Sequence, residues 1–198
     1  MPDLIALDVA ILPPPDVGRR AMELSASLPA EGAQGLTLDA EHLPHVTLMQ
    51  LFVRENELDT AFGRIDDLLR GQEAMSLRVT GGGKSNHTLW LAIERTADLV
   101  ALHERLMETL RGVERQNGGP GAFFEGEGRV GDVMWVAGYR LKSSLEKFTP
   151  HITLGHGEVA PDVKPFAFDA TTIAACHLGR FCTCRRVLRQ WTLALSAR

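Results

Sequence analysis

The chain has 198 residues, of which 44% are hydrophobic, and its formal net charge is −4 at pH 7. This length and apolar content are typical of a globular protein built as one domain or as two closely packed lobes. The negative charge argues against a protein that coats long nucleic acid, because Lys and Arg supply most of that affinity. A small nucleotide or an RNA end remains compatible with it.

The sequence holds no run of about 20 apolar residues of the kind that spans a membrane. Asp3 stands where a signal peptide would carry positive charge. We therefore expect a cytoplasmic protein with no membrane contact.

The first part of the chain alternates between apolar runs and helical patterns. "LIALDVAIL" (4–12) predicts a strand, which the three following prolines end. Apolar residues at helical spacing predict a helix from Asp16 to Leu28, stopped by Pro29. "HVTLMQLFV" (45–53) predicts a second strand, and the apolar stripe over 55–70 predicts a second helix.

The middle of the chain is rich in glycine. "MSLRVT" (75–80) and "HTLWLAIE" (87–94) predict two strands joined by a hairpin turn through 81–86, whose glycines lack the spacing of a P-loop. A third helix is expected over 97–111. The turn-rich segment 115–132 predicts a mobile loop.

The last third contains several short apolar runs. Segment 133–148 fits a helix or a strand equally well, and "HITLGH" (151–156) predicts a strand. "FAFDATTIAACHL" (166–178) and "RRVLRQWTLAL" (185–195) predict two or three more strands. The strands lie close enough in sequence to pair as hairpins, so we expect an α+β fold of two mainly antiparallel sheets flanked by helices.

One short motif occurs twice, as "PHVTL" (44–48) and as "PHITL" (150–154). Each copy falls on a predicted strand, one in each half of the chain, which predicts a bilobal arrangement with pseudo-twofold symmetry. A single His-x-Thr is common and would usually be structural. Two copies with the same Pro before the His and the same Leu after the Thr favour a shared site in a central groove.

Strand alternation predicts which side chains of the motif point together. In the first copy it places Met49 on the face of His45 and Thr47, and Gln50 on the opposite face with Val46 and Leu48. In the second copy it places Gly155 on the face of His151 and Thr153, and turns His156 away from that face.

Two imidazoles and two hydroxyls that converge on one cleft are suited to phosphodiester hydrolysis without a metal. A neutral imidazole can take a proton from water, a protonated one can donate to the leaving oxygen, and hydroxyls can hold phosphoryl oxygens. Histidine suits both roles because its ordinary pKa, about 6.5, lets either form exist near neutral pH.

The two motifs resemble those of the two-histidine (2H) phosphoesterase superfamily, which includes bacterial 2′-5′ RNA ligase-like proteins and cyclic nucleotide phosphodiesterases. The resemblance rests on "PHVTL", on "FTPHITLG" and on their separation, and it covers residues 1–198 in order. It implies a single domain of two intimately packed lobes with both motifs lining a central groove. It also implies metal-independent hydrolysis of a cyclic phosphate, with no cofactor, commonly of a 2′,3′-cyclic phosphate opened to a 2′-phosphate.

Carried over to this chain, the resemblance makes His45 and His151 the catalytic pair and makes Thr47 and Thr153 the phosphate-binding residues. We favour His151 as the base and His45 as the acid. The alternative is a noncatalytic module that binds a nucleotide or an RNA end in the same groove.

The chain departs from many relatives after the second motif, where they carry an Arg and it has Gly155 and His156. Another cation would then meet the phosphate charge, and Lys84 in the glycine-rich segment is one candidate. The others are Arg129, Lys142 and Lys147. Phe148 is a candidate for contact with the substrate, as are Trp90, Trp135 and Trp191, although large aromatic residues in sheets usually pack in the core.

We expect no metal. His42, His45 and His151 lack a carboxylate or thiol at the usual zinc-ligand spacing. A second group would suit zinc by its sulfur ligands and consists of Cys176, His177, Cys182 and Cys184. A strand pattern instead explains Cys182 and Cys184 as small buried apolar residues, and we expect the thiols to be reduced.

Overall fold

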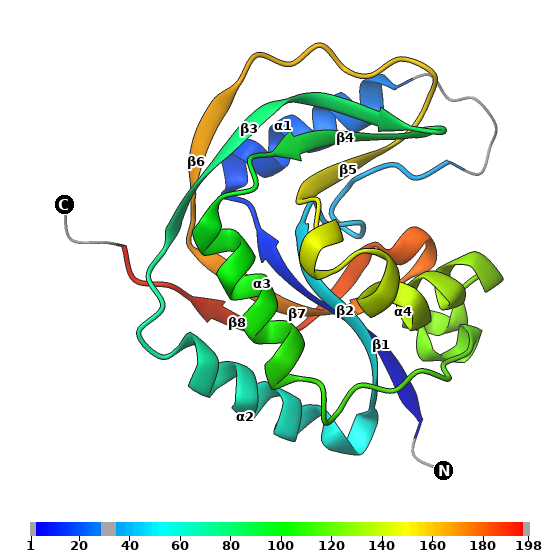
Figure 1. The fold of residues 1–198 in the computed structure, drawn as a ribbon. Coiled ribbons are helices and arrows are strands. Elements are labelled where there is room, and N and C mark those ends of the chain that lie inside the picture. The colour runs from blue at the N-terminus through cyan, green and yellow to red at the C-terminus, as the bar shows by residue number, and fades with distance from the viewer. Residues whose placement is uncertain (1–2, 29–34, 196–198) are drawn as a thin grey trace.

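The computed structural model describes residues 3–28 and 35–195, which form two four-stranded sheets with four α-helices around them (Figure 1). Neighbouring strands in both sheets pair antiparallel. The expected α+β class is thus confirmed. Pro29, the predicted end of the first helix, lies outside the described residues.

Each sheet places the strand of one motif at its edge. The first sheet has the order β2-β1-β7-β8 and consists of β1 (Leu4–Leu12), β2 (Val46–Arg54), β7 (Thr172–Leu178) and β8 (Cys184–Thr192). The second has the order β5-β4-β3-β6 and consists of β3 (Met75–Ser85), β4 (Thr88–Ile93), β5 (His151–His156) and β6 (Phe166–Ala170). The edge strands β2 and β5 lie in contact with each other, so the two motifs meet between the sheets.

The helices pack on both sheets. They are α1 (Pro15–Ser27), α2 (Leu58–Leu69), α3 (Ala97–Thr109) and α4 (Val130–Lys142). α1 begins with proline in its first turn, where a missing N–H costs nothing, and it packs against β5 although it connects β1 to β2. Thr96 caps the start of α3, because its side chain accepts a hydrogen bond from the backbone N–H of Leu99. α4 covers β2 (Figure 1).

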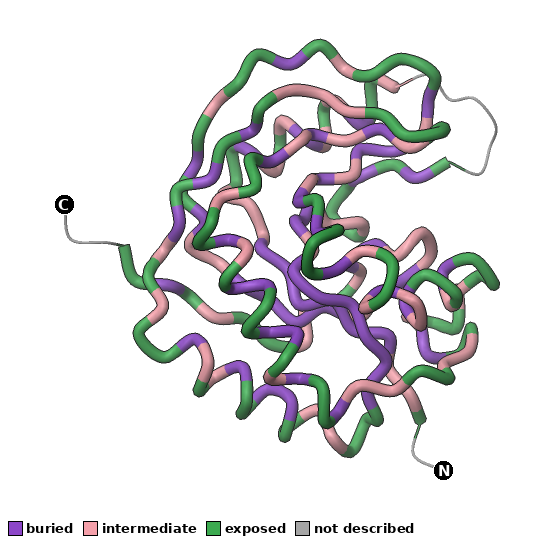
Figure 2. Tube along the Cα trace, in the orientation of Figure 1, coloured by how far each residue is buried: buried purple, intermediate pink, exposed green. Residues whose placement is uncertain are grey.

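Three strands of the first sheet, β1, β2 and β7, are the most deeply buried part of the molecule, whereas β8 is largely part-exposed (Figure 2). The segment predicted as a mobile loop, 115–132, contains two 3₁₀ turns, η2 (Pro120–Ala122) and η3 (Phe124–Gly126), and the start of α4. Its Phe123 is 1% exposed and packs edge-on against Phe52, with ring centroids 5.9 Å apart. This segment is therefore anchored to β2. Segment 133–148, left open by its pattern, is the rest of α4 followed by η4 (Leu145–Lys147).

The prediction that the glycines at 81–83 form a hairpin turn is wrong. They continue β3, which ends only at Ser85, and the turn is Asn86–His87. A Cβ on Gly82 would lie 2.0 Å from the carbonyl oxygen of Pro161, and one on Gly83 would lie 2.1 Å from Trp90 Nε1. Glycine is required here because a chain segment and an indole ring cross the strand at close range.

A β-bulge follows the Thr of each motif. Val9 pairs with Met49 and Ala10 with Thr47, which leaves Leu48 as an extra residue on β2. The pairing between β4 and β5 shifts in the same way and leaves Leu154 extra. An extra residue reverses the alternation beyond it.

The bulges overturn two of the predicted side-chain directions. Met49 is fully buried in the core, and Gln50 lines the cleft in its place. In the second copy His156, predicted to point away, lines the cleft with His151 and Thr153.

The carbonyls of the two extra residues accept hydrogen bonds from buried side chains. Leu48 O accepts from His103 Nδ1 at 2.6 Å and lies 3.4 Å from Tyr139 Oη, while Leu154 O accepts from Ser25 Oγ on α1. Each bulge is thus held by a side chain from a helix.

Candidate active site

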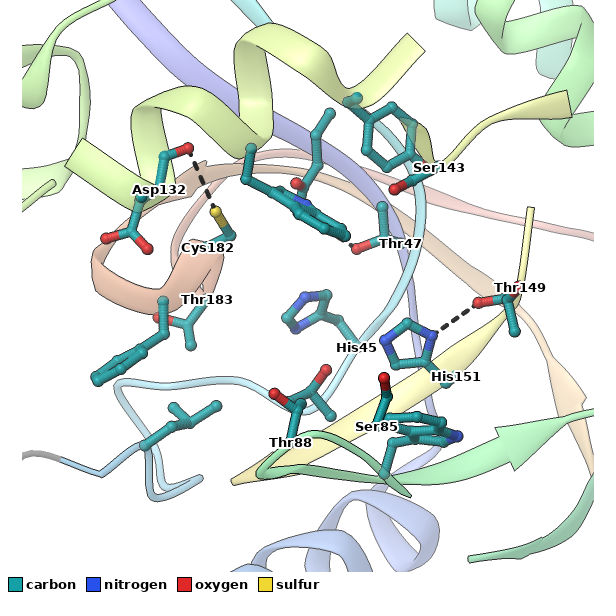
Figure 3. Close-up of a pocket in the computed structure, with 18 of the residues that line it drawn as sticks. His45, Thr47, Ser85, Thr88, Asp132, Ser143, Thr149, His151, Cys182 and Thr183 are labelled. Carbon is teal, nitrogen blue, oxygen red and sulfur yellow. Dashed lines mark hydrogen bonds between the residues drawn. The ribbon is translucent and has the colours of Figure 1, made fainter. Parts of the chain in front are cut away.

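The structure brings the four motif residues together around one cavity of about 650 Å³. His45, directly before β2, and Thr47 on β2 line it from one side, and His151 and Thr153 on β5 line it from the other. The turn after β3, α4 and η5 (Arg180–Cys182) also contribute to its walls. Figure 3 shows the rings of His45 and His151 pointing into this space from the two strands. The predicted groove between two motif strands is therefore present.

Both histidine rings are fixed in the same way. Nδ1 of His45 lies 2.7 Å from the carbonyl oxygen of Leu43, and Nδ1 of His151 lies 2.7 Å from that of Thr149 (Figure 3). A carbonyl oxygen only accepts, so each Nδ1 carries a proton and each Nε2 is the atom that can exchange one. The proline of each motif explains why a carbonyl lies beside the ring. It fixes its own φ and keeps the residue before it, Leu43 or Thr149, in an extended conformation. In that conformation the carbonyl of this residue points at the histidine two positions later.

The surroundings of the two rings differ in charge. Burial lowers the pKa of His151, partly offset by the bond to the Thr149 carbonyl, and a positive charge on His45 lowers it further. The ring of Trp90 lies beside His151 with centroids 5.5 Å apart. Neutral imidazole is therefore the favoured form of His151.

His45 instead has a carboxylate beside it. Nε2 of His45 lies 3.7 Å from Oδ2 of the fully buried Asp8, which also accepts hydrogen bonds from Thr47 and Gln50. Neither Asp8 nor Gln50 was predicted as a site residue. An acidic residue inside the apolar run "LIALDVAIL" was the available signal, since buried carboxylates are rare without a partner.

The end of the second motif opens on a cationic corner. His156 packs near Phe181, with centroids 5.1 Å apart, and the guanidinium of Arg129 lies 3.7 Å from the centre of the same phenyl ring. Two N–H groups of the Arg129 guanidinium bind both carboxylate oxygens of Asp132, at 2.7 and 2.8 Å. Burial lowers the pKa of His156, and Arg129 lowers it further. Arg129 is thus a charged side chain of the cleft wall at the end of the second motif.

A sequence profile of the 2′-5′ RNA ligase superfamily matches residues 13–182 of this chain. The chain belongs to that superfamily. The resemblance to the two-histidine phosphoesterases drawn from the two motifs is thereby confirmed. No curated protein sequence matches the chain.

Solved structures of similar fold cover nearly the whole of this superfamily member. TT0787 of Thermus thermophilus is 19% identical with a TM-score of 0.64 and covers 97% of this chain and 100% of its own. E. coli LigT complexed with 3′-AMP is also 19% identical, with a TM-score of 0.61 and coverage of 96% and 99%. A structure named a phosphoesterase is 20% identical, with a TM-score of 0.58 and the same coverage. These likenesses establish the bilobal fold.

The other candidate residues of this 2′-5′ RNA ligase superfamily member are divided between the cleft and its surroundings. Lys84 does not line the cleft, and its Nζ pairs with Glu158 at 3.0 Å. Phe148 lines the cleft but is 3% exposed, because its ring stacks on the buried His103 at 4.0 Å. The cleft lining also includes Arg129, Lys142, Lys147, Trp90 and Trp135. Trp191, on β8 of the first sheet, does not line it and packs against Phe62 of α2.

The groups considered for zinc are held by other partners in this superfamily member. His42 binds Asp39 through Nδ1 and lies 2.9 Å from Arg185 through Nε2. His177 contacts the carbonyl of Ala122, and Cys182 contacts that of Asp132. A further group, Asp8, His45 and Cys184, has its possible ligand atoms within 4.8 Å of one another. Two hydrogen bonds already occupy the Asp8 oxygen nearest His45. Burial raises the pKa of the Cys184 thiol, which disfavours the thiolate that a metal would need. No described helix is long and apolar enough to span a membrane.

Proposed function

We propose that this protein hydrolyses the 2′,3′-cyclic phosphate of a nucleotide or an RNA end, without a metal, by acid–base catalysis at His45 and His151. The observation that carries the proposal is the matched pair of rings, each with Nδ1 on a backbone carbonyl and Nε2 directed to one cavity. Two fixed imidazoles on opposite sides of one phosphorus supply a base and an acid at the same time.

In the proposed reaction His151 is the base and His45 is the acid. Nε2 of His151 takes a proton from water, and the water oxygen forms a bond to phosphorus. The bond between phosphorus and one ribose oxygen breaks, and that oxygen takes the proton of His45 Nε2. The lowered pKa of His151 supports its role as the base, because burial and the neighbouring cation keep the ring neutral.

Phosphate binding is proposed for both threonines and for Arg129. Thr153 and Thr47 line the cavity beside the two rings, and the Thr47 hydroxyl, whose one proton goes to Asp8 Oδ2 in the free cleft, turns to the phosphate when substrate binds. Arg129 takes the place of the arginine that many relatives have after the second motif, since it lies in the same corner as His156. Trp90 and Trp135 are proposed to contact the base, because both line the cavity and Trp135 is 45% exposed.

The similar structures make a nucleotide ligand reasonable. E. coli LigT has been solved with 3′-AMP, with NADP+ and with ATP. A small nucleotide with a terminal phosphate is therefore the ligand class proposed for this chain as well.

The test is incubation with each of the four 2′,3′-cyclic mononucleotides and with a short RNA ending in a cyclic phosphate. EDTA is present throughout, and phosphorus NMR identifies the product as a 2′- or a 3′-phosphate. We expect turnover with a bell-shaped pH profile whose acid limb lies below the ordinary histidine value of about 6.5. Tight binding of 3′-AMP with no turnover of any substrate would instead support the noncatalytic module, and loss of activity in EDTA would contradict a metal-independent reaction.

A further inference from the structure

Asp8 lies on β1 next to the first motif, and its carboxylate takes no part in the reaction proposed above. The side chain is fully buried, and its register partner on β2 is Gln50. Burying a carboxylate is strongly unfavourable unless hydrogen bonds and an opposite charge compensate. The contacts of Asp8 therefore indicate which charge compensates it.

One oxygen of Asp8 serves every polar side chain that the first motif and its bulge direct to the cleft. Oδ2 accepts hydrogen bonds from Thr47 Oγ1 and from Gln50 Nε2, both at 2.7 Å, and lies 3.7 Å from Nε2 of His45. Oδ1 accepts no hydrogen bond from any residue in the described part of the chain. Neutral donors thus satisfy the carboxylate only in part, and they leave it next to a ring that can carry a positive charge.

The other titratable groups around Asp8 are neutral in their ordinary forms near pH 7. They come from every element packed against it, namely Tyr139 on α4, Cys176 on β7, Cys182 in η5 and Cys184 on β8. Burial raises the pKa of Tyr139, Cys182 and Cys184, which keeps these groups neutral. Burial raises the pKa of the Asp8 carboxyl above its ordinary value, and the charge of protonated His45 and the bonds from Gln50 and Thr47 offset only part of that rise.

The second motif has no equivalent carboxylate. Among the described residues, none of the ion pairs within 4.0 Å involves His151, and the side chain at the position of Gln50 is His156. Two motifs with the same sequence thus differ in whether a buried anion lies beneath the imidazole.

We propose that Asp8 is a positioning residue that pairs with the imidazolium form of His45 and holds Thr47 and Gln50, and that it thereby assigns the general-acid role to His45. Asp8 acts through these side chains and does not touch the substrate. The assignment of the acid role rests on the proposed function, whereas the ion pair between Asp8 and His45 does not depend on it.

The first experiment uses Asp8→Asn, which keeps the shape of the side chain and removes its charge. The alkaline limb of the pH profile reports the loss of the acid's proton, so we expect it to move down by about one pH unit or more. The acid limb, which reports the base, should stay in place, and kcat at pH 8 should fall about tenfold. Urea unfolding verifies that the variant is folded under the conditions of the assay, because removing one partner of a buried ion pair is destabilising.

Thr47→Val is the matched control, because it removes a donor to the same carboxylate oxygen and keeps the carboxylate. Its kcat should fall, but its alkaline limb should not move to lower pH. An alkaline limb that stays in place in Asp8→Asn would overturn the proposal, whatever happens to kcat.

A second experiment does not depend on turnover. Proton NMR of the ring C2 protons, assigned with His45→Gln and His151→Gln, should show His45 titrating at lower pH in Asp8→Asn than in the wild type, with a smaller change at His151. The carboxyl carbon shift of Asp8 in the wild type should report an ionised group at pH 7, and this measurement needs no variant. A protonated Asp8 at pH 7, or an unchanged His45 titration, would refute the ion pair. Failure of all cyclic substrates would refute only the proposed reaction.

Discussion

The strand of the first motif, β2, and the strand of the second, β5, share their geometry and differ in their surroundings. Each places Nδ1 of its histidine on the carbonyl two residues earlier, and each has a bulge one residue after its threonine. The cleft-facing side chains of the first motif contact the buried carboxylate of Asp8. Those of the second motif have no carboxylate beside them, and β5 ends at His156 in the cationic corner near Arg129. Repetition of one backbone design can thus fix two equal positions, while the neighbouring elements give the two positions unequal charge.

The largest effect is expected from removing either ring. His45→Ala and His151→Ala should each lower kcat by roughly 100- to 10,000-fold, as is typical for loss of a general acid or base. Turnover of a 2′,3′-cyclic mononucleotide measures the loss, and binding of 3′-AMP verifies that the cleft still forms. His87→Ala is the control, because that exposed ring pairs with Glu158 and does not line the cavity. A variant of either motif histidine that kept near-wild-type turnover would end the two-histidine assignment.

The second-largest effect is expected from Arg129 in the cationic corner, and Lys84 on the glycine-rich strand β3 is the residue for comparison. Arg129→Gln removes a cation of the cleft wall and should lower kcat/KM about tenfold or more, the scale of one charge-assisted hydrogen bond. Arg129→Lys keeps a charge beside Asp132 and should recover part of the loss. Lys84→Gln should change little, because Lys84 pairs with Glu158 outside the cavity lining. A larger loss from Lys84→Gln than from Arg129→Gln would reverse the assignment.

The third prediction concerns the close packing at the bulge of β5, which the added methyl group of Gly155→Ala would disrupt. A Cβ on Gly155 would lie 2.7 Å from the carbonyl oxygen of Leu36, and its φ of 149° is strained for other residues. Gly155→Ala should therefore lower the free energy of unfolding by about 1–3 kcal/mol, as measured in urea. Gly63→Ala in α2 meets no atom within 4 Å and should be neutral or stabilising. Equal stability of the two variants would contradict a required bulge.

The smallest effect concerns the side chains that hold the two bulges. The buried His103 donates to Leu48 O through Nδ1 and accepts from the backbone N–H of Leu145 through Nε2, whereas Ser25 holds Leu154 and does not titrate. Burial lowers the pKa of His103 in the folded state, so protonation favours the unfolded chain. The free energy of unfolding should fall as the pH drops from about 6.5 toward that lower value, by at most about 1.4 kcal/mol per pH unit for this one group.

His103→Gln should reduce this dependence without abolishing it, because burial also lowers the pKa of His151, His156 and His177. Urea unfolding at pH 5.5 and 7.5 gives the comparison. An identical pH dependence in the variant would mean that His103 is not the group responsible.

Much of the fold could be predicted from the sequence, because apolar alternation and helical spacing reflect burial directly. The strands over 4–12 and 151–156 and the helix that begins at Ala97 lie where the pattern placed them. The glycine run was misread because a turn and a close crossing both favour glycine, and only the position of Pro161 and Trp90 distinguishes them.

The site residues could be predicted from side-chain alternation along each motif strand up to the bulge, but not for the residues after the bulge. His45, Thr47, His151 and Thr153 share the cleft as the pattern indicated. Gln50 and His156 were placed on the wrong face, because a bulge depends on pairing with β1 or β4, which the local sequence of the motif does not specify.

The path of α1 has a consequence for how substrate enters. The chain leaves the first sheet after β1, packs α1 against β5 of the second sheet, and returns to the first sheet as β2. Arg20 of α1 lies over the ring of Phe166, and Ser25 binds Leu154. α1 therefore ties the second sheet to the first, in addition to the contact between β2 and β5. We expect the spacing of the histidines to be set during folding, with access governed by side chains at the rim such as the half-exposed Trp135.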